Sequence, residues 1–267
     1  MDWDLYNELV TLEYSGEPDE ALRGLNELEK QCEDADEKVV VLLAISNCLV
    51  LLDQYGEARR ALGKAFALVG KNSHFYPRIA FKDAYIDIYL RDWRKSLAKL
   101  DAVLKESSET LQIPENADVF EHVRTSRGIV LLELRRYRKA LPLLEEAAIA
   151  RPGDGELLIY LGACYFGLRE MDKSTDCFAR ALKVELDAKL RYKAHFFLGS
   201  IYYAQGSFAW AKQEFEEALQ QGEQRQLSRR NIYEYLRLTS QSLGLESEVE
   251  RYSELLKQLN RPSESSK

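Results

Sequence analysis

The residues that most often carry chemistry are scarce in this 267-residue chain. It has three histidines, which lie far apart in the sequence, and four cysteines, none of which forms a CxxC pair. Metal and redox sites usually need paired thiols, or histidines at ligand spacing. We therefore expect no cofactor and no metal, and we expect the cysteines to be reduced and packed as small apolar side chains.

Long apolar runs are also missing. The longest, residues 39–45 and 48–52, are separated by Ser46 and Asn47 and fall short of the roughly 20 residues that a membrane span needs. The first residues show neither the basic nor the apolar region of a signal peptide. These features predict a cytoplasmic protein that does not enter a membrane.

An excess of basic residues is absent too, because the formal net charge is -7. Phosphate contacts supply most of the affinity of nucleic-acid-binding proteins, so no nucleic-acid partner is expected. The sequence has no nucleophile elbow, no phosphate-binding glycine loop and no HExxH motif. His195 is expected to be a satisfied, buried histidine, and the chain is predicted not to be an enzyme.

A recurring helix-turn-helix pattern dominates what is present. Its clearest copy places small and large residues at fixed positions on two helices that are separated by a glycine, namely Leu198, Gly199, Tyr202, Gly206, Ala211, Phe215 and Ala218. Similar skeletons start at Leu161 and at Gly128. The small residues let the two helices approach closely, and the large residue between them fills the remaining space.

This pattern resembles the tetratricopeptide repeat, a helical hairpin of about 34 residues. The resemblance implies an all-α, right-handed superhelical solenoid of about seven hairpins, which form a single domain over residues 1–259. A disordered polar tail is expected at 260–267, and residues 107–116 are the expected irregular connection. The units are placed with starts near Asp2, Val39, Pro77, Glu121, Gly155, Tyr192 and Arg230.

In this family the first helix of each hairpin lines a concave groove that binds peptides. Carried over to this chain, the resemblance makes the groove rich in aromatic residues, which bury large areas at little entropic cost. The tyrosines among them are expected to expose their hydroxyl groups. The candidate binding residues are Tyr6, Asn47, Arg78, Lys82, Tyr85, Tyr89, Tyr160, Phe197, Tyr203 and Tyr235.

Three of these candidates would suit a carboxylate. Asn47, Arg78 and Lys82 lie at groove positions of neighbouring units, as in relatives that hold the acidic end of a peptide. The other positions of that clamp hold different residues here, so an ordinary solvated Arg/Lys pair is the more expected outcome. The groove is expected to bind an extended or helical segment with apolar anchors.

The leading hypothesis is an adaptor or scaffold whose groove holds a segment of another protein. One alternative is a structural module that self-associates through its terminal helices, since Trp3 lies in the apolar first helix. Another is a regulator that responds to a peptide and acts on a separate output protein. The identity of the partner does not follow from this scaffold, because one repeat architecture carries many specificities.

Overall fold

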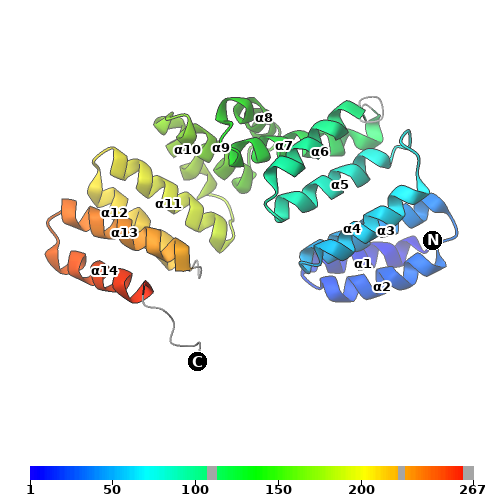
Figure 1. Ribbon diagram of the computed structural model, residues 1–267, viewed down its shortest axis with the longest axis horizontal. Coiled ribbons are helices and arrows are strands. Elements are labelled where there is room, and N and C mark those ends of the chain that lie inside the picture. Colours follow the sequence, from blue (N-terminus) through cyan, green and yellow to red (C-terminus); the bar gives the residue numbers. More distant parts are fainter. Residues whose placement is uncertain (107–112, 222–225, 261–267) are drawn as a thin grey trace. The chain divides into compact units, whose positions relative to one another are not determined.

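The protein is described by a computed structural model that covers residues 1–106, 113–221 and 226–260 (Figure 1). These residues form α-helices and one short 3₁₀ helix, η2 (Pro114–Asn116), and contain no strand. The predicted tail lies outside the described residues except for Asn260. The α-helices are α1 (Trp3–Ser15), α2 (Pro18–Gln31), α3 (Ala35–Leu51), α4 (Tyr55–Leu68), α5 (Tyr76–Tyr89), α6 (Trp93–Glu106), α7 (Ala117–Glu133), α8 (Tyr137–Ala150), α9 (Gly155–Gly167), α10 (Met171–Ala181), α11 (Ala188–Ala204), α12 (Phe208–Gln220), α13 (Gln226–Ser242) and α14 (Glu246–Leu259).

Short turns connect each odd-numbered helix to the next helix, and each turn contains a residue with positive φ. Three of these residues are glycines, which adopt this conformation without a steric cost. The other four carry side chains and have φ between 56° and 65°, a conformation that costs an L-residue roughly 1–2 kcal/mol. In chain order the seven are Gly16, Asp53, Arg91, Arg135, Arg169, Gly206 and Gly244. By subtraction they recur every 34 to 44 residues.

Aspartates determine where several first helices begin. Each precedes the helix in an extended conformation, and its carboxylate accepts a hydrogen bond from a backbone N–H of the first turn. The capped helices are α1, α3, α9 and α11, and the capping residues are Asp2, Asp34, Asp154 and Asp187. These caps fix the start of four of the seven odd-numbered helices.

Small residues allow the two helices of a hairpin to approach closely, as the sequence pattern predicts. A Cβ atom added to Gly162 would lie 3.0 Å from the ring of Phe178, and one added to Gly199 would lie 2.8 Å from the ring of Phe215. Both rings are fully buried. At the small position of α10, the Ser174 hydroxyl donates to the Gly162 carbonyl at 2.8 Å.

The chain divides into two compact units, residues 1–134 and 135–267. In the first unit, apolar residues from α1 to α5 form one continuous core cluster. In the second, one cluster includes residues of α9, α10 and α11, and another joins α11 and α12 to α13 and α14. The boundary falls inside the repeat expected to begin near Glu121, and a single domain over residues 1–259 stays a prediction.

Candidate partner-binding surface

A buried polar chain connects the first helices of three successive hairpins in the first unit. Lys82 of α5 donates a hydrogen bond from Nζ to Oδ1 of Asn47 on α3. Asn47 in turn hydrogen-bonds to Glu13 of α1, whose side chain is only 7% exposed. By subtraction, Glu13, Asn47 and Lys82 lie 3, 6 and 9 residues before the positive-φ residue of their own hairpins, so the contacts shift by about one helical turn from each first helix to the next.

Burial shifts the pKa values of Lys82 and Glu13, the residues at the two ends of this polar chain. By surface area Lys82 is only partly buried, but its ammonium group is densely surrounded by protein atoms. This burial lowers the pKa of Lys82 from 10.5 to about 8. Burial also raises the pKa of Glu13, against the attraction of Lys82. The expectation that Lys82 is an ordinary solvated cation is therefore wrong.

Arg78, the second candidate cation, is also occupied by the protein itself. Its guanidinium binds both carboxylate oxygens of Asp118 on α7 at 2.8 Å and donates to the Glu115 carbonyl at 3.2 Å. The pairing with Arg78 lowers the pKa of Asp118 although burial opposes it. The protein itself therefore supplies the carboxylates that these three candidates would attract. Asp118 binds Arg78, and Glu13 hydrogen-bonds to Asn47, which accepts from Lys82.

An aromatic row runs beside these polar contacts. We use this name for Tyr55 at the start of α4, Tyr89, Tyr85 and Phe81 on α5, and His122 on α7. Successive ring centroids along it are 6.1, 5.2, 5.6 and 6.2 Å apart. Tyr85 is 39% and Tyr89 46% exposed. Because residues 81, 85 and 89 are four apart, they share one face of α5, on which Tyr85 and Tyr89 are more than a third exposed.

Tyr6, the candidate on α1, is half-buried and packs against the core of the first unit. Its ring meets Trp3 edge to face, with centroids 5.7 Å apart. Burial raises the pKa of its hydroxyl. The structure therefore places Tyr6 partly in the packing of the first hairpin.

The four candidates of the second unit divide into two groups. Tyr160 on α9 is half-buried, with its hydroxyl 3.0 Å from a carboxylate oxygen of Glu156 and the Lys193 ammonium 5.6 Å from its ring. The other three pack against neighbouring aromatic rings. Phe197 stacks on Phe178 at 5.1 Å.

Tyr203 and Tyr235 complete that second group. Tyr235 stacks on Phe215 at 4.8 Å, and Tyr203 meets Tyr235 edge to face at 5.8 Å. Both tyrosines are half-buried and belong to the apolar cluster around α11, α12 and α13. Together with Phe197 they stabilise the contacts between hairpins, and Tyr85 and Tyr89 are the candidates that the structure leaves more than a third exposed.

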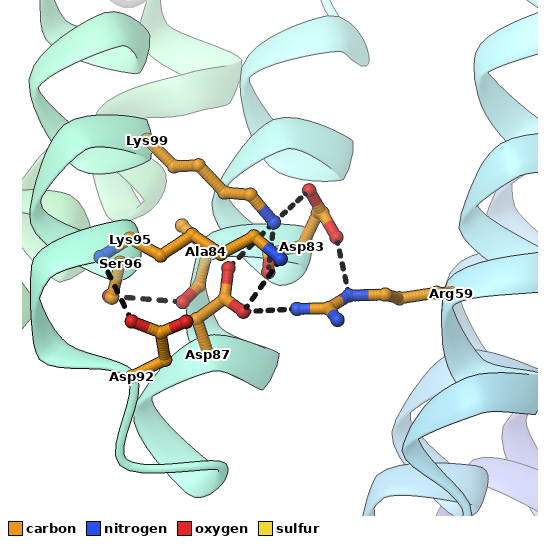
Figure 2. A network of polar contacts seen from close by, with 8 residues as sticks. All are labelled: Arg59, Asp83, Ala84, Asp87, Asp92, Lys95, Ser96 and Lys99. Carbon is orange, nitrogen blue, oxygen red and sulfur yellow. Dashed lines mark hydrogen bonds and ion pairs between the residues drawn. The ribbon is translucent and has the colours of Figure 1, made fainter.

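The structure also contains a polar network that the sequence analysis missed (Figure 2). Asp83 and Asp87 of α5 face Arg59 of α4 and Lys99 of α6. Arg59 Nε lies 3.2 Å from Asp83 and its Nη2 contacts Asp87. Lys99 Nζ lies 2.5 Å from Asp83 and 2.7 Å from Asp87, and Lys95 lies 3.7 Å from Asp87.

This network links three helices through a carboxylate that is only 1% exposed. Oδ2 of Asp87 accepts no hydrogen bond within the described part of the chain, although Lys99 neutralises it as an ion-pair partner. A signal was present in the sequence, because residues 83 and 87 are acids four apart and residues 95 and 99 are lysines four apart. Such pairs lie on one helical face, but only the tertiary structure turns the two faces toward each other.

The residues with potential for metal or redox chemistry are dispersed or buried. The four cysteines are buried and free, and burial raises the pKa of Cys48 to about 12. His195 is mostly buried and lies 2.8 Å from Glu214, as expected. Among the described residues no three His, Cys, Asp or Glu side chains group as metal ligands. None of the described helices has the length and apolar character that crossing a bilayer requires.

Comparison with known proteins identifies the repeats. Models of the tetratricopeptide repeat match residues 131–194 and 172–225. No curated protein matches the chain.

Solved structures share the fold. The quorum sensor NprR from B. thuringiensis is 16% identical, with a TM-score of 0.76 over 96% of this chain and 73% of its own. Pseudomonas aeruginosa PilF is also 16% identical, with a TM-score of 0.62 over 85% of this chain and 93% of its own. YrrB, described as a tetratricopeptide-repeat protein with an unusual peptide-binding site, is 16% identical, with a TM-score of 0.50 over 76% of this chain and 95% of its own. With their helical hairpins and small-on-large packing, the repeats matched over residues 131–225 are tetratricopeptide repeats.

Proposed function

We propose that the chain is a cytoplasmic, non-catalytic adaptor that binds a segment of another protein on the first-helix surface of its first unit. The observation that supports this most is the aromatic row, in which Tyr85 and Tyr89 are 39% and 46% exposed. A packed helix normally turns polar residues to solvent, whereas α5 presents large rings that would gain by burial against a partner.

The charges around the row favour apolar over ionic recognition. Arg78 is paired with Asp118, and Lys82 is joined to Glu13 through Asn47. A charged partner would have to displace these internal contacts, at the cost of leaving an acid unpaired. Binding to the aromatic rings, by contrast, would require only the release of water from their exposed surfaces.

Capture from a lysate of the source organism tests the proposal. Three immobilised proteins are compared: the wild type, Tyr85→Ala/Tyr89→Ala, and the control Ile149→Ala. Ile149 is 82% exposed on the second helix α8, so its truncation removes exposed apolar area away from the row. All three are first shown by circular dichroism to be equally helical.

We expect a protein that is retained by the wild type and by Ile149→Ala and is lost from Tyr85→Ala/Tyr89→Ala. The loss should be roughly tenfold or more, since aromatic anchors dominate binding energy. Equal retention by all three proteins would refute the assignment of the binding surface.

A second candidate function, self-association, is favoured by one observation on α1. Trp3, Leu5 and Tyr14 are 50%, 36% and 80% exposed, which leaves apolar area on the first helix. Analytical ultracentrifugation over a range of protein concentrations would measure self-association. It would become the leading function if the molecular mass of the wild type rises with concentration while that of Trp3→Ala/Leu5→Asn stays at the monomer value.

A further inference from the structure

The aromatic row has a geometry that selects among the conformations a bound segment can adopt. Its rings are spaced between 5.2 and 6.2 Å along α5 and onto the ends of its neighbours. A partner lying along α5 therefore meets the rings of Tyr89, Tyr85 and Phe81 in turn. The row consists of Tyr55, Tyr89, Tyr85, Phe81 and His122, as defined above.

We propose that the row binds a proline-rich segment of a partner protein in the polyproline II conformation, with a basic residue of that segment at Asp53. This inference rests on the proposed function, since it names the kind of segment that the adaptor binds. It excludes a β-strand and an α-helix as the bound form.

The spacing of the rings matches the spacing of contacts along such a segment. A polyproline II helix rises about 3.1 Å per residue with three residues per turn, so two residues of each turn touch the surface beneath it, one about every 4.7 Å. Rings that recur every 5.2 to 6.2 Å offer about one aromatic face or edge to each contacting residue. A segment of about eight residues would cover the row.

Backbone hydrogen bonding favours this conformation over a β-strand. A bound strand gains affinity by pairing its backbone with the edge of a sheet, but the row lies mainly on a helix, whose own backbone groups are already paired within it. A strand laid there would leave its N–H groups without partners. Proline has no N–H group, so a proline-rich segment avoids that loss.

An acidic group at one end of the row supplies charge complementarity. Asp53 follows α3, is exposed, and has a φ of 58° that fixes the turn. Its carboxylate accepts a hydrogen bond from the Tyr55 hydroxyl, a neutral donor, and no ion pair in the described part of the chain uses it. This charge remains available for a lysine or arginine of the partner.

Fluorescence anisotropy with three labelled peptides tests the inference. The probe is an octaproline flanked by arginines, the charge control is the same octaproline flanked by aspartates, and the conformational control is an amphipathic helical peptide of equal length. Each is titrated with the wild type, Tyr85→Ala/Tyr89→Ala, Asp53→Asn and the control Ile149→Ala.

The arginine-flanked probe should bind the wild type and Ile149→Ala equally. We expect it to bind Tyr85→Ala/Tyr89→Ala roughly tenfold or more weakly, and Asp53→Asn several-fold more weakly. The aspartate-flanked peptide should bind the wild type more weakly than the probe does.

Preference for the helical peptide, or binding of the probe that does not change in Tyr85→Ala/Tyr89→Ala, would overturn the inference. If the probe fails while lysate capture still depends on Tyr85 and Tyr89, the adaptor function stands and the proline-rich ligand is wrong. If capture does not depend on these tyrosines either, both proposals fail.

Discussion

Substituting alanine for Gly199 tests how the hairpins are held together. The added Cβ would lie 2.8 Å from two ring carbons of Phe215 and 3.0 Å from a third, well inside the 3.5–4.0 Å at which carbon atoms attract. The ring has little room to move, because Phe215 is fully buried and stacks on Tyr235 at 4.8 Å. Overpacking of this kind costs about 1–3 kcal/mol.

Helix propensity works in the opposite direction. Replacing glycine by alanine inside a helix normally stabilises it by about 1 kcal/mol, so Gly199→Ala should lose a net of up to about 2 kcal/mol. The matched control is Gly63→Ala on α4, where nothing lies within 4 Å of the added Cβ. Gly63→Ala should therefore gain about 1 kcal/mol, so Gly199→Ala should be less stable than Gly63→Ala by about 1–3 kcal/mol.

Urea unfolding followed by circular dichroism measures both changes, and a double-mutant cycle identifies the cause. Phe215→Leu should cost less in the Gly199→Ala background than in the wild type, by about 1 kcal/mol, since the smaller side chain relieves the contact. The packing argument is refuted if Gly199→Ala gains as much stability as Gly63→Ala, or if the effects of Gly199→Ala and Phe215→Leu simply add.

Other predictions concern the turns, the buried polar chain and the thiols. Arg169→Gly should raise the melting temperature, with a gain of up to about 1 kcal/mol, because φ at this position is 65°; a lower melting temperature would contradict the strain. Burial lowers the pKa of Lys82 from 10.5 to about 8, so between these pH values the unfolded state binds more protons than the folded state. In urea unfolding the wild type should therefore gain stability as pH rises from about 8 toward 10.5, and Lys82→Met should lack that part of the gain. Cys48, fully buried and with its pKa raised to about 12, should react with a thiol reagent only after unfolding, and rapid labelling of the native protein would argue against this packing.

The hairpins were predictable because their signal is local. Gly162 and Gly199 each precede a large aromatic residue by a fixed interval on the next helix, and helical periodicity alone brings the two into contact. The turns are a different case. Gly206 marks its turn in the sequence, but Arg91, Arg135 and Arg169 adopt positive φ where no sequence preference indicates it.

The candidate site was only partly predictable, since exposure depends on neighbours that are distant in sequence. Tyr85 and Tyr235 are both tyrosines on first helices, yet Tyr85 is exposed and Tyr235 stacks on Phe215. In the same way, the sequence offers Arg78 and Lys82 as cations for a partner, and α7 and α1 bring Asp118 and Glu13 to them instead.

The sequence by itself determined that this protein is built of tetratricopeptide-type helical hairpins, since periodicity, small-residue positions and caps act within about forty residues. The tertiary structure decided which aromatic rings remain open and which charges are already neutralised. Those outcomes depend on side chains from three or four helices meeting at one place, and the energies that govern them, desolvation and ion pairing, exist only once the helices are packed.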